Sequence, residues 1–213
     1  MAGIILAGGK GKRLGGKKKA LYSLAGKPML EHVITRLDPL FDRLILVTNT
    51  PELYSDFPGM VVTDIHPGHG PLSGIEAGLI AAGVGFHFVT GCDMPCLNPR
   101  LIEFLRKRGR DYDIVVPRLG HYIEPLHSFY RYDILPHITA LISTGNYRLS
   151  ALLTAPLKVL HVNENEIKNF DPDLSSFLNI NTTADVLRAE IMLTQGEKRS
   201  ETNGDYEHCQ MEK

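Results

Sequence analysis

The chain has 213 residues, of which 43 % are hydrophobic and 22 % are charged, as expected for a globular protein with one core. Its formal net charge of −1 argues against a nucleic-acid coat or a membrane-surface protein, and no apolar run approaches the about 18 residues that a membrane span needs. The apolar N-terminal run has no basic leader, and three cysteines are too few for a disulfide framework. We therefore expect a cytoplasmic protein that binds neither nucleic acid nor membrane.

Short apolar runs alternate with helical patterns along the chain. Strands are predicted at residues 2–7, 44–48, 60–63, 87–90, 114–116, 124–130 and 157–162. Helices are predicted after Pro28, over 73–82, 99–108 and 134–143, and from Thr182, where Thr182 and Asp185 form a capping-box pattern. Residues 177–181 alternate in polarity and indicate one more short strand.

This alternation predicts a Rossmann-like three-layer α/β sandwich with a mostly parallel sheet covered by helices on both faces. We expect a single domain over residues 1–193. The last 19 residues hold eight charged and only three clearly apolar side chains, so residues 194–213 are predicted to form a disordered tail.

Polar residues follow several of the predicted strands. A glycine-rich stretch follows the first, and Asn49, Asp64 and Asp93 follow the second, third and fourth. In open α/β sheets, ligands bind beyond the carboxyl ends of the strands. The sequence therefore predicts a binding site at this edge, although Asn and Asp are also common turn formers after strands.

The glycine-rich stretch is also strongly basic. Six positive charges fall within ten residues: Lys10, Lys12, Arg13, Lys17, Lys18 and Lys19. Glycines let backbone N–H groups turn toward an anion, and basic side chains supply charge for a polyphosphate. The P-loop motif nearly fits, but Lys18 stands where it needs Ser or Thr, and the dinucleotide fingerprint fails at Leu14. We predict a phosphate-binding loop; the alternative is a solvated basic hairpin tip.

Five motifs together resemble the molybdenum cofactor guanylyltransferases, within the larger family of nucleotidyltransferases that also makes nucleotide sugars. The first is Leu6-Ala7-Gly8-Gly9 followed by Arg13-Leu14-Gly15 and Lys19. The others are Gly70-Pro71-Leu72-Ser73-Gly74, Cys92-Asp93-Met94-Pro95, Glu124-Pro125-Leu126 and Asn179-Ile180-Asn181-Thr182. In the family the residue before the motif lysine is often Asp, but here it is Lys18, so a carboxylate that would orient Lys19 is missing.

The resemblance implies transfer of GMP from GTP to molybdenum-bound molybdopterin, with release of pyrophosphate. It implies catalytic roles for Arg13, Lys19 and Asp93, and a Mg²⁺ ion held by Asp93. The nucleotide-binding residues that it implies are Leu6, Ala7, Gly8, Gly9, Lys19, Asn49, Asp64 and Asp93. Asn179 and Asn181 are implied on the pterin side, and transient contact with molybdoenzymes or their chaperones would follow. Lys17 and Lys18 are expected to be mainly exposed charges.

Other functions remain open from the residues alone. One is a cytidylyltransferase or nucleotide-sugar pyrophosphorylase of the same fold, and another is a GTP-binding module without turnover. Gly8 favours the guanine class, because similar cytidylyltransferases carry Leu-Ala-Ala-Gly. The alternative role for Asp93 is to cap the turn that follows it. Cys92 and Cys96 are expected to be buried small side chains rather than zinc ligands. His127 is expected to pack or to line the acceptor cleft rather than to act in nucleophilic catalysis.

Overall fold

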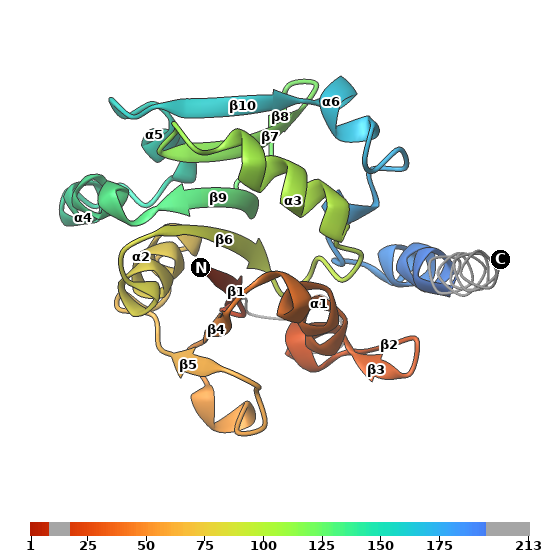
Figure 1. The fold of residues 1–213 in the computed structure, drawn as a ribbon. Coiled ribbons are helices and arrows are strands. Elements are labelled where there is room, and N and C mark those ends of the chain that lie inside the picture. Colours follow the sequence, from red (N-terminus) through yellow and green to blue (C-terminus); the bar gives the residue numbers. More distant parts are fainter. Residues whose placement is uncertain (9–17, 195–213) are drawn as a thin grey trace, which may run out of the picture.

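The computed structural model describes residues 1–8 and 18–194. One mixed sheet forms its centre, with strands in the order β10-β7-β9-β6-β1-β4-β5, and β8 pairs with β7 (Figure 1). The strands are β1 (Ala2–Leu6), β4 (Arg43–Val47), β5 (Met60–Val62), β6 (Phe86–Gly91), β7 (Ile114–Leu119), β8 (Tyr122–Ile123), β9 (His127–Arg131) and β10 (Val159–Asn163). A separate two-stranded hairpin consists of β2 (Ser23–Leu24) and β3 (Lys27–Pro28).

Within residues 1–8 and 18–194, six helices surround the sheet, together with a helix that covers residues 183–194. They are α1 (Met29–Leu37), α2 (Pro71–Ala82), α3 (Pro99–Arg108), α4 (Leu135–Ser143), α5 (Leu149–Leu153) and α6 (Glu164–Lys168). Short 3-10 helices lie at Lys19–Leu21, Asp38–Leu40, Pro51–Leu53, Tyr132–Ile134 and Ser175–Phe177. None of the helices in the described residues is long and apolar enough to cross a membrane.

The sheet is mostly parallel, as predicted. Strand β1 pairs in parallel with β4 on one side and with β6 on the other. Strand β4 also pairs in parallel with β5, and β10 pairs in parallel with β7. Strand β9 is antiparallel to both β6 and β7. The chain places β4 and β5 on one side of β1 and then β6 on its other side, so the strand order reverses at β1. Open α/β sheets bind ligands in the crevice at such a reversal.

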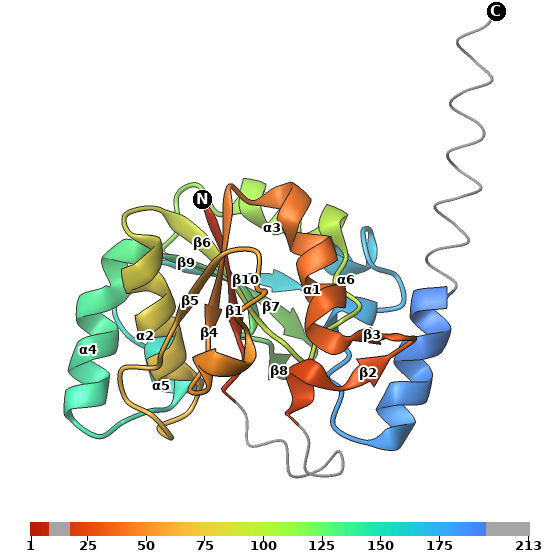
Figure 2. The same ribbon diagram turned by 90° about the horizontal axis from the view of Figure 1, so that it is seen from below.

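Helices cover both faces of the sheet, which confirms the three-layer sandwich. Figure 2 shows α2, α4 and α5 on one side and α1, α3 and α6 on the other. The alternation of side chains along β1 places Ile5 in the core beneath α1 and α3, and Ile4 in the core beneath α2 and α4. A third apolar cluster joins the β2–β3 hairpin to the final helix through Leu24, Ile180 and Val186.

Helix α2 lies very close to the centre of the sheet. A Cβ atom on Gly78 would lie 2.5 Å from Ile4 Cγ2, so only glycine leaves room for this approach. The close packing places the N-terminal end of α2 beside the end of β1, where the glycine-rich stretch begins.

Most predicted elements are confirmed, but the strand predicted at 124–130 begins later, as β9, and the short strand predicted at 177–181 is wrong. Residues 124–126 form a turn before β9, because Pro125 has no N–H group and the buried carboxylate of Glu124 accepts the Leu126 N–H at 3.0 Å. No strand covers residues 177–181. The carboxylate of Asp171 accepts the N–H groups of Ser175 and Ser176 and holds a 3-10 helix at Ser175–Phe177, and the N–H of Ile180 donates to the Asp93 carbonyl.

The final helix begins as predicted. The N–H of Asp185 donates to the Thr182 hydroxyl oxygen at 3.2 Å, and the Asp185 carboxylate accepts the Thr182 N–H at 2.8 Å, which is a reciprocal capping box. Thr194, placed in the predicted tail, is still helical. The rest of that tail, residues 195–213, lies outside the described residues.

Candidate nucleotide site

A cavity of about 470 Å³ opens at the carboxyl ends of the central strands. Its walls come from the ends of β1, β4 and β6 and from the segments that follow β4, β5 and β6. Seven of the residues singled out in the sequence line it: Leu6, Ala7, Gly8, Lys19, Asn49, Asp64 and Asp93. The tertiary structure thus brings together side chains that are far apart in the chain, as the strand-end argument predicts.

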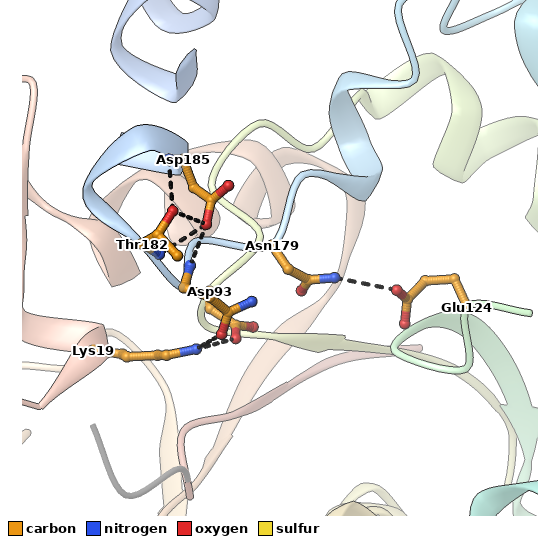
Figure 3. Close-up of polar contacts among 7 residues, drawn as sticks. Lys19, Asp93, Glu124, Asn179, Thr182 and Asp185 are labelled. Carbon is orange, nitrogen blue, oxygen red and sulfur yellow. Dashed lines mark hydrogen bonds and ion pairs between the residues drawn. The ribbon is translucent and has the colours of Figure 1, made fainter. Parts of the chain in front are cut away.

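Lys19 and Asp93 form an ion pair at the edge of this cavity. Lys19 Nζ lies 3.0 Å from Asp93 Oδ2 and 2.6 Å from Asn181 Oδ1 (Figure 3). The side chains of Lys19 and Asp93 are 17 % and 24 % exposed, so both are sheltered but open to a ligand. Gly91, the last residue of β6, also lines the cavity and places Asp93 two residues beyond the strand.

Asp64 is fixed by the start of α2. Its Oδ1 accepts the N–H of His66 at 3.0 Å and the hydroxyl of Ser73. Gly68 and Gly70 both adopt positive φ, +87° and +82°, in the loop that connects Asp64 to α2. These positive φ values favour glycine, and the resulting loop brings the backbone to the cavity wall.

Tyr54 and Thr48 line the same cavity and were not singled out as site residues in the sequence, whereas Gly70, which also lines it, belongs to the motif at residues 70–74. Tyr54 is buried, its pKa is raised to about 12 mainly by burial, and its hydroxyl has no hydrogen-bond partner among the described residues. It follows a 3-10 helix that begins at Pro51, and a lone tyrosine in a connecting loop gives no sequence signal for this position.

Asn179 contacts a different part of the site, on the side of β8 and β9. Its Nδ2 donates to Glu124 Oε2 at 3.3 Å (Figure 3). The Tyr122 hydroxyl donates to the same oxygen at 3.0 Å. Glu124 is buried, and these contacts join the β8–β9 turn to the segment before the final helix. Asn179 and Asn181 do not line the cavity, but each contacts a residue beside it.

Two predicted residues, Gly9 and Arg13, lie outside the described residues, as does Lys17. Lys18 differs from its prediction as a mainly exposed charge, because it is half-buried and lines the cavity. It caps the 3-10 helix at Lys19–Leu21, and its carbonyl accepts the Leu21 N–H at 3.1 Å, which turns the chain into the site.

The nearby thiols and His127 are poorly suited to nucleophilic chemistry. Burial raises the pKa of Cys92 to about 12 and that of Cys96 to about 11, so both thiols stay protonated at neutral pH. His127 is fully buried, its ring packs against Phe88 and Phe177, and burial lowers its pKa to about 3. The packing role expected for these three residues is therefore the one that the structure shows.

Comparison with known proteins gives a consistent family. Residues 3–160 match the MobA-like NTP transferase domain. A probable molybdenum cofactor guanylyltransferase of Peptoclostridium acidaminophilum is 37 % identical over 202 residues, covering 92 % of this chain and 90 % of that protein. A molybdenum cofactor guanylyltransferase of Desulfosudis oleivorans is 34 % identical over 197 residues, covering 92 % and 97 % of the two chains.

A solved structure shows the same fold. Molybdopterin-guanine dinucleotide biosynthesis protein A from Archaeoglobus fulgidus has a TM-score of 0.80 and 29 % identity, covering 92 % of this chain and 100 % of that one. The family match and the two relatives each cover well over half of the chain. The chain therefore belongs to the MobA-like NTP transferase family and is a nucleotidyltransferase.

Proposed function

We propose that this nucleotidyltransferase moves a guanylyl group from GTP to the terminal phosphate of molybdopterin carrying molybdenum, and releases pyrophosphate. The observation that carries the proposal is the Lys19–Asp93 pair at the edge of a nucleotide-sized cavity, in a chain whose relatives are named as molybdenum cofactor guanylyltransferases. The resemblance that the sequence motifs carry supports the same reaction.

The nucleotide base and ribose are assigned to the part of the cavity beside the ends of β4 and β5. Asn49 and Asp64 follow β4 and β5 there, and the backbone of Leu6, Ala7 and Gly8 forms the wall at the end of β1. Asp64 Oδ1 is already bonded to His66 and Ser73, so its carboxylate is held in place before any nucleotide arrives. A fixed carboxylate suits ribose hydroxyls or guanine N–H donors.

The phosphates are assigned to Lys19, Gly9 and Arg13. An ammonium has three donors, and Asp93 and Asn181 take two of those of Lys19, so the third is available to a phosphate oxygen. Arg13 would supply a fork of donors where Lys19 supplies a point charge. Gly9 and Arg13 belong to the basic stretch outside the described residues, so their roles rest on the sequence motif.

The reaction needs little proton transfer. An oxygen of the acceptor phosphate, already an anion at neutral pH, attacks the α-phosphorus; a new P–O bond forms, and the bond to the β-phosphate bridging oxygen breaks. The enzyme's task is to bring two anions together in line and to stabilise the charge that develops on the leaving pyrophosphate. Lys19 and Arg13 carry positive charge to that position.

Nucleotidyl transfer typically uses a divalent metal, and we assign Mg²⁺ to Asp93. The donor set fits this ion, because Mg²⁺ takes one or two carboxylates together with substrate phosphates and water. Among residues 1–8 and 18–194, no group of three His, Cys, Asp or Glu side chains forms a metal cage. When bound, Mg²⁺ would neutralise charge on the nucleotide phosphates, while Lys19 keeps the Asp93 carboxylate oriented.

The acceptor is assigned to the side of Asn179 and Asn181. The Asn181 amide contacts Lys19 of the ion pair, and the Asn179 amide contacts Glu124. A molybdopterin phosphate bound beside Asn181 would therefore lie near the α-phosphate of GTP. The product would then pass to molybdoenzymes or their chaperones by transient contact. We place the reaction in the cytoplasm, which the free thiols of Cys92 and Cys96 fit.

The test is a pyrophosphate-release assay with GTP, CTP, ATP and UTP, each with and without molybdenum-loaded molybdopterin. We expect release only with GTP and only when the acceptor is present. Release with CTP instead would replace this function by cytidylyl transfer. A parallel assay with a sugar phosphate as acceptor detects a nucleotide-sugar enzyme, and calorimetric GTP binding without pyrophosphate release would indicate a binding module.

A further inference from the structure

Asp185, in the first turn of the final helix, makes one contact more than a helix cap requires. Its Oδ2 accepts the N–H of Thr182 at 2.8 Å and the Thr182 hydroxyl at 2.8 Å, which belong to the cap. The same oxygen accepts the N–H of Asn181 at 3.0 Å, one residue before the capping position. The carboxylate therefore binds the backbone of a residue whose side chain lies in the candidate site.

Asn181 is held from its other side as well. The N–H of Ile180 donates to the backbone carbonyl of Asp93 at 2.9 Å, and the Ile180 side chain is fully buried among Leu24 and Val186. With both flanking peptide groups fixed, the Asn181 side chain has a defined direction. Its Oδ1 lies 2.6 Å from Lys19 Nζ.

Lys19 needs an orienting partner, because a lysine side chain is long and flexible. The preceding residue is Lys18, which repels the Lys19 ammonium instead of holding it. Among the described residues, the ammonium contacts two acceptors, Asn181 and Asp93, which lie 162 and 74 residues away in the chain. Figure 3 shows the resulting series of contacts from Asp185 at the final helix to Lys19 and Asp93.

We propose that Asp185 is a positioning residue for Lys19, acting through the backbone and side chain of Asn181. The inference rests on the proposed role of Lys19 in binding the phosphates of GTP. Asp185 contacts neither Lys19 nor the cavity, so its effect on the reaction passes through the placement of the Lys19 ammonium. The final helix then contributes to nucleotide chemistry although it lies outside the cavity.

The experiment compares Asp185→Ala with Thr182→Ala in the full-length protein. Both substitutions remove cap hydrogen bonds from the same helix, but only Asp185→Ala removes the acceptor of the Asn181 N–H. With GTP, Mg²⁺ and saturating molybdenum-loaded molybdopterin, we expect Asp185→Ala to lower kcat/KM for GTP about tenfold. Thr182→Ala should stay within about twofold of the wild type at a similar loss of Tm. Asp185→Glu, which restores the capping-box carboxylate, should recover most of the activity. If Asp185→Ala fails to fold, the milder Asp185→Asn takes its place.

A second arm separates this inference from the proposed function. In a Lys19→Met background, adding Asp185→Ala should cause no further loss of kcat/KM, because the group that it positions is gone. Equal losses of activity in Asp185→Ala and Thr182→Ala would overturn the positioning role. So would a tenfold loss caused by Asp185→Ala both in the wild type and in the Lys19→Met background. Either result leaves the proposed role of Lys19 intact as long as Lys19→Met alone is defective. Near-normal activity of Lys19→Met alone would instead overturn the proposed role of Lys19, and the inference with it.

Discussion

Lys19 Nζ lies 3.0 Å from Asp93 Oδ2, although 74 residues separate them in the chain. The pair joins the end of the basic stretch to the end of β6, and it stands beside the cavity between them. In the absence of a nucleotide, each charge compensates the other. When GTP and a metal bind, both charges acquire new partners, so the two residues should be tested separately.

Asp93→Ala should leave a folded protein with at least about a hundredfold less guanylyl transfer, because the proposed metal loses the carboxylate assigned to it. Pyrophosphate release measures the loss, and circular dichroism checks the fold. Asp133→Ala is the matched control, since Asp133 is exposed at the start of a 3-10 helix remote from the cavity residues. Turnover close to that of the control would remove Asp93 from the reaction.

Lys19→Ala should reduce kcat/KM for GTP by about a hundredfold, whereas Lys18→Ala should have a much smaller effect. Both side chains line the cavity, but only Lys19 contacts Asp93 and Asn181. Lys18 adds positive potential that salt screens. Steady-state kinetics at two salt concentrations distinguish the two roles, with the exposed Lys27→Ala as control. Similar small, salt-dependent losses in both variants would mean that the lysines act only as diffuse charge.

Gly8→Ala should weaken the use of GTP more than that of CTP, and the wild type should prefer GTP by at least about tenfold in kcat/KM. A Cβ atom on Gly8 would meet no atom of the described residues within 4 Å, so the substitution should leave the fold unchanged. A change in the choice between GTP and CTP would then indicate contact of this residue with the nucleotide base. Competition between the two nucleotides measures it, and unchanged selectivity in the variant would leave Gly8 without a role in base choice.

Gly78→Ala should destabilise the protein by about 1–3 kcal/mol, because the new methyl group would lie 2.5 Å from Ile4 Cγ2 in the core. Urea denaturation gives the free energy of unfolding. Gly74→Ala on the same helix is the control, since its Cβ atom would lie 3.3 Å from the flexible end of Leu6 and require only a small shift. If the two variants were equally stable, the close approach of α2 to β1 would not depend on glycine.

His127→Phe should reduce the loss of stability at low pH. Burial holds the pKa of His127 at about 3, below its ordinary value of 6.5, so between these values the unfolded chain binds more protons. The free energy of unfolding then falls as the pH falls, by up to about 1.4 kcal/mol per pH unit from this group. Denaturation between pH 7 and 4 should show a shallower slope in the variant, and the exposed His121→Phe should keep the wild-type slope. Equal slopes in all three proteins would contradict the buried neutral state.

The sequence by itself determined the fold class and the edge of the sheet at which the candidate site lies. Buried strands separated by amphipathic helices have few arrangements other than a covered parallel sheet, so the order of strands and polar residues along the chain was enough to assign the end of β1, Asn49, Asp64 and Asp93 to one edge. Capping residues and prolines are local signals, which explains why the limits of α3 at Pro99–Arg108 and the start of the final helix were predicted well.

Only the tertiary structure decided which side chains contact one another. The turn at Glu124 and the 3-10 helix before Asn179 depend on buried carboxylates that accept backbone N–H groups. The spacing of apolar residues along the chain does not predict such hydrogen bonds. The contact of Lys19 with Asn181 spans 162 residues and depends on a helix that packs against the β2–β3 hairpin. Local sequence specifies local backbone preference, whereas the placement of a distant amide next to an ammonium follows from the packing of the whole core.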